Sequence, residues 1–310
     1  MSLHKGLAAD MVLSGLDEVF FSAFNREPMP NMADVEDDMI FRQDTTDRSG
    51  VITEQMKDAG MWNSRSELAD LDEGNILAGN KKTHTVAAFA QSLPISKHYF
   101  DDEQYGTVKE SVTKMGLKGM LTKRREAFGI YRNAFTTTLT NAGTALCSDS
   151  HSNLNGDTVD NLLTDVFSES ALNTAINQLL EQKDQAGDNV GFEPYCLLVP
   201  NRLFKQAAEI LESELRSGTG NNDMNVYSEK YGIYLKQSNW LGAANSGSNT
   251  AWFLLAKDHT IKRWVRQPII TDLVDYKYAK NFVYEYKAEY REVYGAISYE
   301  GIVGSTGAGA

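Results

Sequence analysis

The most constraining feature of the sequence is a polar stretch of sixty residues, 41–100, with too little apolar content to form a core of its own. Its four glycines are widely spaced, and its best strand-like patch is 83–89, where threonine and valine favour extended backbone. Unstructured loops of this length are uncommon in compact domains unless they serve a function. The stretch is therefore predicted to be a long excursion that is stabilised by a neighbour.

The rest of the composition is ordinary for a globular chain of 310 residues, and length alone suggests about two domains. Only two cysteines occur, Cys147 and Cys196, which excludes a disulfide scaffold or a cysteine-rich metal site. No apolar run spans a membrane, and the N-terminus does not look like a signal peptide, so a cytosol-like compartment is expected. The net charge of −12 is unusual for a protein that reads nucleic-acid sequence.

Two helices are predicted in the first half of the chain. Apolar residues recur at three and four positions within 3–24, which indicates an amphipathic helix. Prolines 28 and 30 then end the helix, and 25–40 is predicted to be an extended arm that leaves the body, with a solvated surface loop as the alternative. Residues 102–135 are predicted to form one long helix, in which several glycines permit a bend.

This second helix carries seven basic residues between 109 and 132 against two glutamates, a local charge of +5. Such a run is most often a solvated helix face, and otherwise faces a polyanion or an acidic neighbouring subunit. The candidate site residues are the cations of this face: Lys109, Lys114, Lys118, Lys123, Arg124 and Arg125.

The second half of the chain has the pattern of mixed helix and sheet, so the fold class is α+β. The expected helices are 169–185 and 201–215, and the expected strands are 195–199, 232–235, 251–256 and 260–270. The clearest strand is 282–291, where aromatic residues alternate strictly with charged ones. We expect the charged face to pair with the next strand. The tail from residue 304 is small and looks flexible.

Catalytic motifs are few, and no catalytic, cofactor-binding or metal residue is assigned. Cys147 and His151 could be a nucleophile and base, but a buried thiol and a hydrogen-bonding loop histidine are the simpler interpretation. The segment 151–157 resembles a calcium loop, yet position twelve is Leu162 rather than a glutamate. The glycines of 218–220 are predicted to belong to a surface loop.

Three segments carry a family resemblance. They are ALCSDSH at 145–151 with NLNG at 153–156, LLVPNRL at 197–203, and WFLL at 252–255 followed by the strand within 282–303. In this order they resemble the major capsid proteins of tailed bacteriophages with the Hong Kong 97 fold, and the first is similar to Mu-like major head subunits. The resemblance covers 100–303 by motif.

The resemblance implies a layout in which the polar excursion serves a neighbouring subunit. Its parts would be an N-terminal arm (1–46), an extended E-loop (47–100), a P-domain with the spine helix (101–164), an A-domain (165–272), P-domain return strands (273–304) and a flexible tail (305–310). The basic helix would be the spine, with its cations on the inner surface. About forty residues precede the excursion, so a separate scaffold, or none, is expected.

The implied function is a major capsid protein that self-assembles into hexamers and pentamers of an icosahedral shell around double-stranded DNA. The expected partners are other copies, a portal, separate scaffolding or decoration proteins, and packaged DNA bound non-specifically, with no membrane and no cofactor. It would be found in the virion after assembly in the host cytoplasm. Two alternatives stay open: an encapsulin-like compartment shell, and an enzyme that depends on Cys147 and His151.

Overall fold

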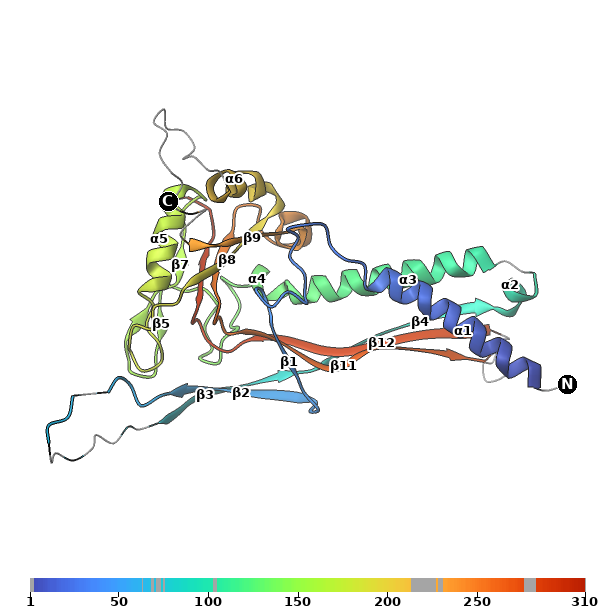
Figure 1. Cartoon of the computed structure of the whole chain (residues 1–310), viewed down its shortest axis with the longest axis horizontal. Helices are drawn as coiled ribbons and strands as arrows, with labels where there is room; N and C mark the ends of the chain where they lie inside the picture. The colour runs from blue at the N-terminus through green and yellow to red at the C-terminus, as the bar shows by residue number, and fades with distance from the viewer. Residues whose placement is uncertain are drawn as a thin grey trace.

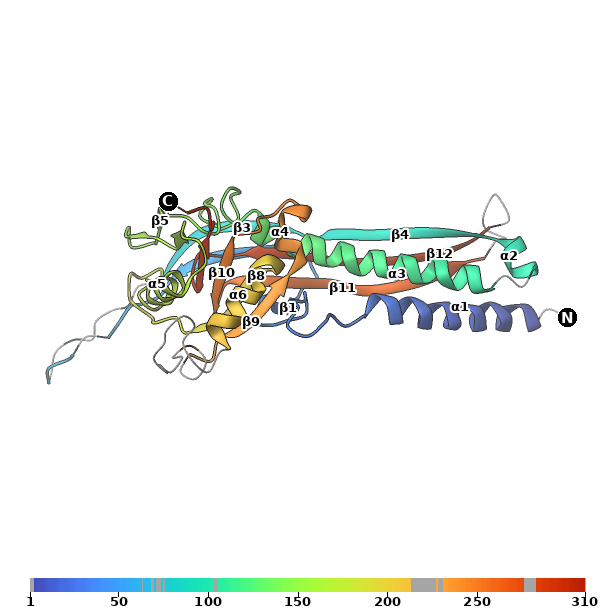
Figure 2. The same cartoon turned by 90° about the horizontal axis from the view of Figure 1, so that it is seen from above.

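The molecule is elongated, with a compact unit at one end and a long sheet with two helices running toward the other (Figures 1 and 2). The computed structural model describes residues 3–62, 64–67, 70, 74, 76–102, 105–212, 227, 231–275 and 283–309. Across these ranges we find no helix with the length and apolarity that a membrane crossing needs. The predicted loop at 218–220 lies outside the described residues.

The elongated unit is built on a four-stranded sheet in the order β1-β11-β12-β4. Its strands are β1 (Arg42–Thr45), β11 (Ile261–Val274), β12 (Val283–Ala296) and β4 (Ala87–Ser96), of which β1 runs parallel to β11 and the others are antiparallel. The alternation predicted for β12 is confirmed, because Tyr286 and Tyr290 are buried while Lys287 is exposed. On the predicted charged face, Lys287 Nζ is 2.9 Å from Glu285 Oε2 of the same strand rather than from a charge on the next strand.

Helices α1 (Leu3–Phe24) and α3 (Tyr105–Ala127) cover one face of this sheet (Figure 2). Their apolar stripes bury Phe20 and Val112 against Tyr286 and its neighbours. A Cβ atom on Gly116 would come within 2.7 Å of the Phe20 carbonyl oxygen. A Cβ atom on Gly119 would likewise meet the Phe24 ring, so these two of the glycines that we expected to permit a bend instead permit close approach of the two helices.

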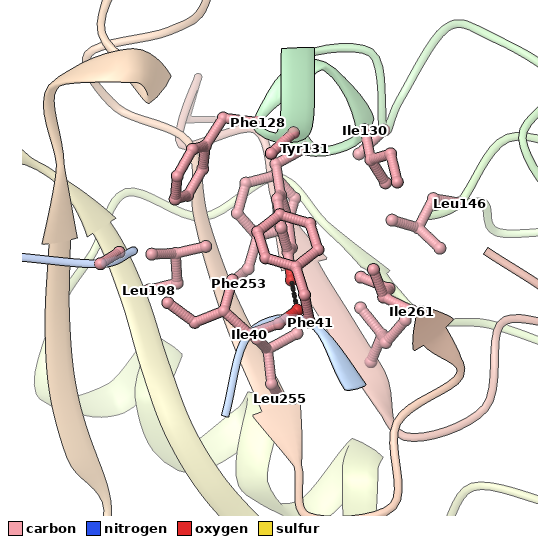
Figure 3. Close-up of a cluster of buried hydrophobic side chains, with 14 of the residues drawn as sticks. Ile40, Phe41, Phe128, Ile130, Tyr131, Leu146, Leu198, Phe253, Leu255 and Ile261 are labelled. Atoms are coloured by element: carbon pink, nitrogen blue, oxygen red, sulfur yellow. Dashed lines mark hydrogen bonds between the residues drawn. The ribbon is translucent and has the colours of Figure 1, made fainter. Parts of the chain in front are cut away.

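The long helix predicted over 102–135 is divided. A short helix, α2 (Lys97–Asp101), precedes α3, and α4 (Gly129–Arg132) follows it after a turn at Phe128. Tertiary packing explains the break, because Phe128 and Tyr131 enter the central core beside Phe41 and Phe253 (Figure 3). Helix propensity is a weak constraint beside burial of two large aromatic rings.

The compact unit contains a five-stranded mixed sheet in the order β7-β13-β10-β8-β9. The strands are β7 (Leu162–Leu163), β13 (Ile302–Ser305), β10 (Trp252–Ala256), β8 (Pro194–Pro200) and β9 (Tyr234–Ser238). Helices α5 (Glu169–Leu180) and α6 (Asn201–Leu211) pack their apolar faces on β8 and β10, which confirms the predicted helix–strand–helix arrangement. Ser168 caps α5 by accepting a hydrogen bond from the Ala171 N–H. A small pair, β5 (His151–Ser152) and β6 (Thr158–Val159), and two 3₁₀ turns, η2 (Asn239–Leu241) and η3 (Ala243–Asn245), complete the unit.

The polar excursion forms a hairpin of β2 (Gly50–Lys57) and β3 (Leu77–Thr85), which projects from the body (Figure 1). Strand β3 passes through Val86 into β4, so extended backbone runs from 77 to 96 where the sequence indicated only 83–89. The polar pattern hid this strand, because β3 packs on no large core and most of its residues are exposed.

Three sequence predictions need correction. The segment 25–40 does not leave the body, because Val35, Ile40 and Phe41 are buried in the central core. Strand β11 belongs to the long sheet, so the compact unit does not extend to residue 272 as the predicted A-domain does. The tail is held, since Ser305 is buried and the Gly309 N–H donates to the Thr164 carbonyl at 2.9 Å.

Candidate assembly surfaces

The hairpin carries the largest set of exposed apolar side chains in the described part of the chain. Trp62, just beyond β2, is 97% exposed. The other members of this hairpin surface are also at least 46% exposed, and they are Ile52, Met56, Met61, Ile76 and Leu77. An apolar cluster of this kind on a projecting element marks an interaction site, because a monomer gains nothing from exposing it. A sequence signal exists, as Met61 and Trp62 stand within an otherwise polar stretch, but two apolar residues alone do not indicate a surface.

The base of the hairpin is joined to the body by polar contacts. Lys82 Nζ donates to the carbonyl oxygens of Thr138 and Leu139, at 3.0 and 2.7 Å. Thr53 Oγ1 donates to Asn141 Oδ1 at 2.9 Å. Burial lowers the pKa of Lys82, which nevertheless keeps two carbonyl acceptors. Two contacts lie nearer the tip, from Lys57 Nζ to Asn155 Oδ1 at 2.9 Å and from the Met61 N–H to Asp188 Oδ2 at 3.2 Å, so the hairpin is attached to the body at its base and beside the compact unit.

The six cations predicted as a basic face do not share one environment. Lys109 and Lys118 lie exposed on α3, while Lys114 Nζ is 2.6 Å from Glu110 and Arg125 Nη2 is 2.8 Å from Glu126. These four positions present positive charge at the surface, with two of them locally compensated.

Lys123 and Arg124 instead bind the acidic segment that follows α1. Arg124 donates from Nε and Nη2 to the two carboxylate oxygens of Asp34, both at 2.9 Å, and Lys123 Nζ lies 2.7 Å from Glu36 Oε1. The hydrogen bond from Lys123 lowers the pKa of Glu36, against the opposing effect of burial. Bidentate arginine–carboxylate pairs fix geometry as well as charge. Two of the six predicted residues are thus occupied within the subunit.

We call residues 31–45 the strap, because they connect α3, the central core and the compact unit. Lys236 Nζ on β9 is 2.7 Å from Asp37 Oδ2, and the Ala33 N–H donates to the Gln237 carbonyl at 2.8 Å. The Tyr131 hydroxyl donates to the Ile40 carbonyl at 2.8 Å (Figure 3). The acidic run, for which the sequence predicted an extended arm, therefore supplies ion-pair partners to α3 and β9.

A buried ion pair within the long sheet, between β11 and β12, also holds the strap through a hydrogen bond. Arg263 Nε and Nη2 donate to Glu292 Oε2 at 3.0 and 2.8 Å, and Nη1 donates to Gln43 Oε1 at 2.9 Å. The hydroxyl of Tyr294 also donates to Glu292. Burial acts to lower the pKa of Arg263, but the charge of Glu292 and its neighbours outweighs burial, so the pKa is raised. Removing one partner would leave a buried charge uncompensated, so this pair is a structural constraint.

Cys147 and His151 are not arranged for catalysis. Cys147 is 1% exposed, and burial raises the pKa of its thiol well above the usual value, which disfavours the thiolate nucleophile. His151 stacks on Tyr299 with ring centroids 4.8 Å apart and bonds Thr144 Oγ1 at 3.0 Å through Nδ1. The structure confirms the simpler interpretation of both residues.

The loop that resembles a calcium site is closed by its own hydrogen bonds. Asn153 Oδ1 accepts from the backbone N–H groups of Asn155 and Asp157, at 3.1 and 2.7 Å. Asp157 also pairs with Lys183 at 3.3 Å. Throughout the described residues, no group of three or more metal-ligating side chains converges.

The architecture defines the class of protein: a long-stranded sheet under a spine helix, a compact α/β unit and a projecting hairpin are the Hong Kong 97 capsid fold. A cyanophage P-SCSP1u capsid structure matches with a TM-score of 0.56 at 11% identity, covering 90% of each chain. The mature capsid of bacteriophage PhiM1 gives 0.54 at 12%, covering 90% of this chain and 88% of that one. A virus-like particle from Pyrococcus furiosus gives 0.52 at 12%, covering 94% and 98%.

The family model described as phage capsid protein matches residues 80–305, so the chain belongs to the phage capsid protein family. It is a major capsid protein that forms an icosahedral shell, which confirms the function predicted from the sequence. None of the curated proteins searched matches the chain. The family match does not separate the Mu-like group from other members, so that part of the resemblance stays a prediction.

Proposed function

We propose that the subunits form hexamers and pentamers in which the β2–β3 hairpin is the E-loop and contacts a second copy. The observation that carries this proposal is the exposed apolar hairpin surface, with Trp62 97% exposed at its far end. In the same layout, the strap and α1 serve as the N-terminal arm, α3 as the spine of the P-domain, and the compact unit as the A-domain.

A shallow hollow on the open face of the long sheet is a suitable docking site for the hairpin surface of a second copy. It has a volume of about 340 Å³ and is lined by the half-exposed Ile270, by small side chains such as Ala90, and by charged residues that include Lys287. Figure 1 shows β2 and β3 extending from the region of β1 toward one end of the long axis, while β4, β11 and β12 run toward the other end. One copy cannot bring them together, so the contact would be head-to-tail, the arrangement that closes into rings.

The shell is proposed to enclose double-stranded DNA, with non-specific contacts from the exposed cations of α3. Lys109 and Lys118 support this, because exposed cations bind phosphates without reading sequence. Assembly in the host cytoplasm, with a portal and separate scaffolding or decoration proteins, belongs to the same proposal. An encapsulin-like shell around protein cargo is the second candidate, favoured by the similarity to a virus-like particle.

Electron microscopy of the purified full-length chain tests the proposal. We expect closed shells or free capsomers with six and five subunits, and absorbance spectra that show nucleic acid in filled shells. Shells that contain only protein would favour the second candidate. A protein that stays monomeric at high concentration, with hairpin amides protected from exchange, would contradict both.

A further inference from the structure

The strongest unexplained feature of the fold is a polar cluster where the hairpin meets the body. His84 lies on β3 and is only 7% exposed, although the strand around it is mostly exposed. Its imidazole stacks on Trp264 of β11, with ring centroids 5.2 Å apart and an interplanar angle of 28°. Because the neutral imidazole stacks on the indole and fills a closed site, both the position and the orientation of the His84 side chain are fixed.

The Nε2 edge of the His84 ring is connected to the body by hydrogen bonds. His84 Nε2 is 3.0 Å from Thr53 Oγ1 on β2, and the Thr53 hydroxyl donates to Asn141 Oδ1 at 2.9 Å. Since the hydroxyl proton is used toward Asn141, Nε2 is the donor to Thr53. Asn141 is itself fixed, because its N–H donates to the Ile297 carbonyl at 3.0 Å. A chain of hydrogen bonds thus runs from both hairpin strands to the loop at 138–144.

The other edge of the ring has no spare room. A Cβ atom on Gly295 of β12 would clash with the His84 imidazole and reach 3.0 Å from the Trp264 ring. Glycine at 295 therefore leaves the space that His84 occupies. Lys82 adds its two bonds to the carbonyls of Thr138 and Leu139 beside this site.

We propose that His84 is a positioning residue: with Thr53, Asn141, Trp264 and Gly295 it forms a clamp that sets the direction in which the hairpin leaves the body. Farther along the hairpin, Lys57 Nζ donates to Asn155 Oδ1 at 2.9 Å and the Met61 N–H donates to Asp188 Oδ2 at 3.2 Å, so the clamp adds a buried contact at the base to polar contacts nearer the tip. The inference rests on the proposed function. A fixed direction of the hairpin matters there, because its tip must contact a second copy. A two-stranded hairpin without a core is marginally stable alone, so its orientation has to come from such contacts.

The clamp requires a neutral imidazole. Burial, together with the charge of Lys82, lowers the pKa of His84 to about 4. Among the described groups packed against the ring, Lys82 is the charged one; Thr53, Asn141, Trp264 and Gly295 carry no charge. An open hairpin would return the pKa of His84 to its ordinary value of 6.5. Protons therefore favour the open state as the pH falls from 6.5 toward 4, and the open fraction should rise by about tenfold or more.

Spin labels at Met56→Cys on the hairpin and Ser92→Cys on β4 measure the direction directly. Cys147 and Cys196 are buried, so the native thiols should not be labelled. In unassembled full-length subunits at pH 7, we expect one narrow distance distribution. His84→Ala and Gly295→Ala should each broaden it, the second without removing a polar group of the clamp. Thr85→Ala, at an exposed neighbour on β3, is the matched control and should leave it narrow.

The pH profile separates positioning from general stability. His84→Gln keeps a donor toward Thr53 but cannot take up a proton. Its distance distribution should therefore stay narrow from pH 7 to 4.5, while the distribution of the native subunit broadens. Unchanged distributions in both His84→Ala and Gly295→Ala, or acid broadening that persists in His84→Gln, would overturn the clamp. Because these measurements use single subunits, they do not depend on whether the tip binds a second copy, which assembly of Trp62 variants tests separately.

Discussion

Replacement of Trp62 by alanine should weaken the shell without weakening the subunit. The side chain is 97% exposed in the single subunit, so its loss removes almost no buried surface there. Surface substitutions of this kind usually change the free energy of unfolding by less than about 0.5 kcal/mol. In the proposed shell the same side chain is buried against a second copy, so the loss appears only on assembly.

The magnitude follows from the area of the ring. Complete burial of a tryptophan removes about 150–250 Å² from water, which at roughly 25 cal/mol per Å² corresponds to an upper estimate of about 4–6 kcal/mol. Interface hot spots usually lose at least about 2 kcal/mol on truncation, and this lower figure already corresponds to roughly 30-fold in the association constant of each interface. Many such interfaces close one shell, so the concentration threshold for assembly should rise steeply.

The assay is light scattering across a concentration series, with thermal unfolding of unassembled subunits measured in parallel. Met29→Ala is the matched control, because Met29 is 67% exposed but lies outside the hairpin. We expect a higher threshold for Trp62→Ala, partial recovery for Trp62→Phe, and no change for the control. If Trp62→Ala assembles at the native concentration, the proposed contact at the hairpin tip is wrong.

Three further predictions concern the subunit itself. Gly116→Ala should lower the free energy of unfolding by about 1–3 kcal/mol, measured by chemical denaturation, because the added methyl group meets the Phe20 carbonyl. Gly106 faces open space, so the control Gly106→Ala should be neutral or stabilising by up to about 1 kcal/mol. The pKa of Glu36 is lowered by its hydrogen bond from Lys123, so its contribution to the stability of the subunit is present above pH 4.5 and is lost as the pH falls through the lowered pKa. On acidification, the melting temperature of the native chain should therefore drop more than that of Glu36→Gln. Cys147 and Cys196 should react with a thiol reagent only on unfolding, and rapid reaction of the native chain would contradict their burial.

Regular periodicity explains where sequence reasoning succeeded. The alternation in β12 and the stripe of α1 each indicate one face that is buried in a core, the apolar run in β8 indicates a strand buried on both faces, and each was located correctly. Local pattern and tertiary environment agree in these elements, so the sequence alone indicates their structure.

Sequence reasoning failed where a segment is stabilised by residues far along the chain. The strap has little local signal, because its stability comes from Arg124, Lys236 and Arg263, up to 220 residues away from the strap residue they bind. No apolar alternation marks the hairpin strands, because β3 is mostly exposed and the buried residues of β2 are the polar Thr53 and Gln55. His84 could not be selected either, since its role depends on a tryptophan and a glycine contributed by two other strands.

The strap also changes how the proposed interaction with DNA has to be tested. The run from 109 to 132 carries seven cations and two glutamates, but Asp34 and Glu36 lie against the same helix, so the local charge falls from +5 to +3. Reversing Lys118, Lys123 and Arg125 together would confuse two effects, because Lys123 holds the strap. Lys109→Glu with Lys118→Glu avoids this, since both side chains are exposed on α3 away from the strap.

This pair of reversals should preserve shell formation and the melting temperature while weakening DNA retention as salt is raised. For each phosphate that the variant no longer neutralises, the slope of log affinity against log salt should become shallower by about 0.9. Arg124→Glu is the contrasting variant, because it opposes a carboxylate to Asp34 and should lower subunit stability first. If the double reversal leaves DNA retention and its salt dependence unchanged, the exposed cations of α3 do not contact the genome. The positive charge of the helix would then act within the subunit, as the bonds of Lys123 and Arg124 to the strap already do.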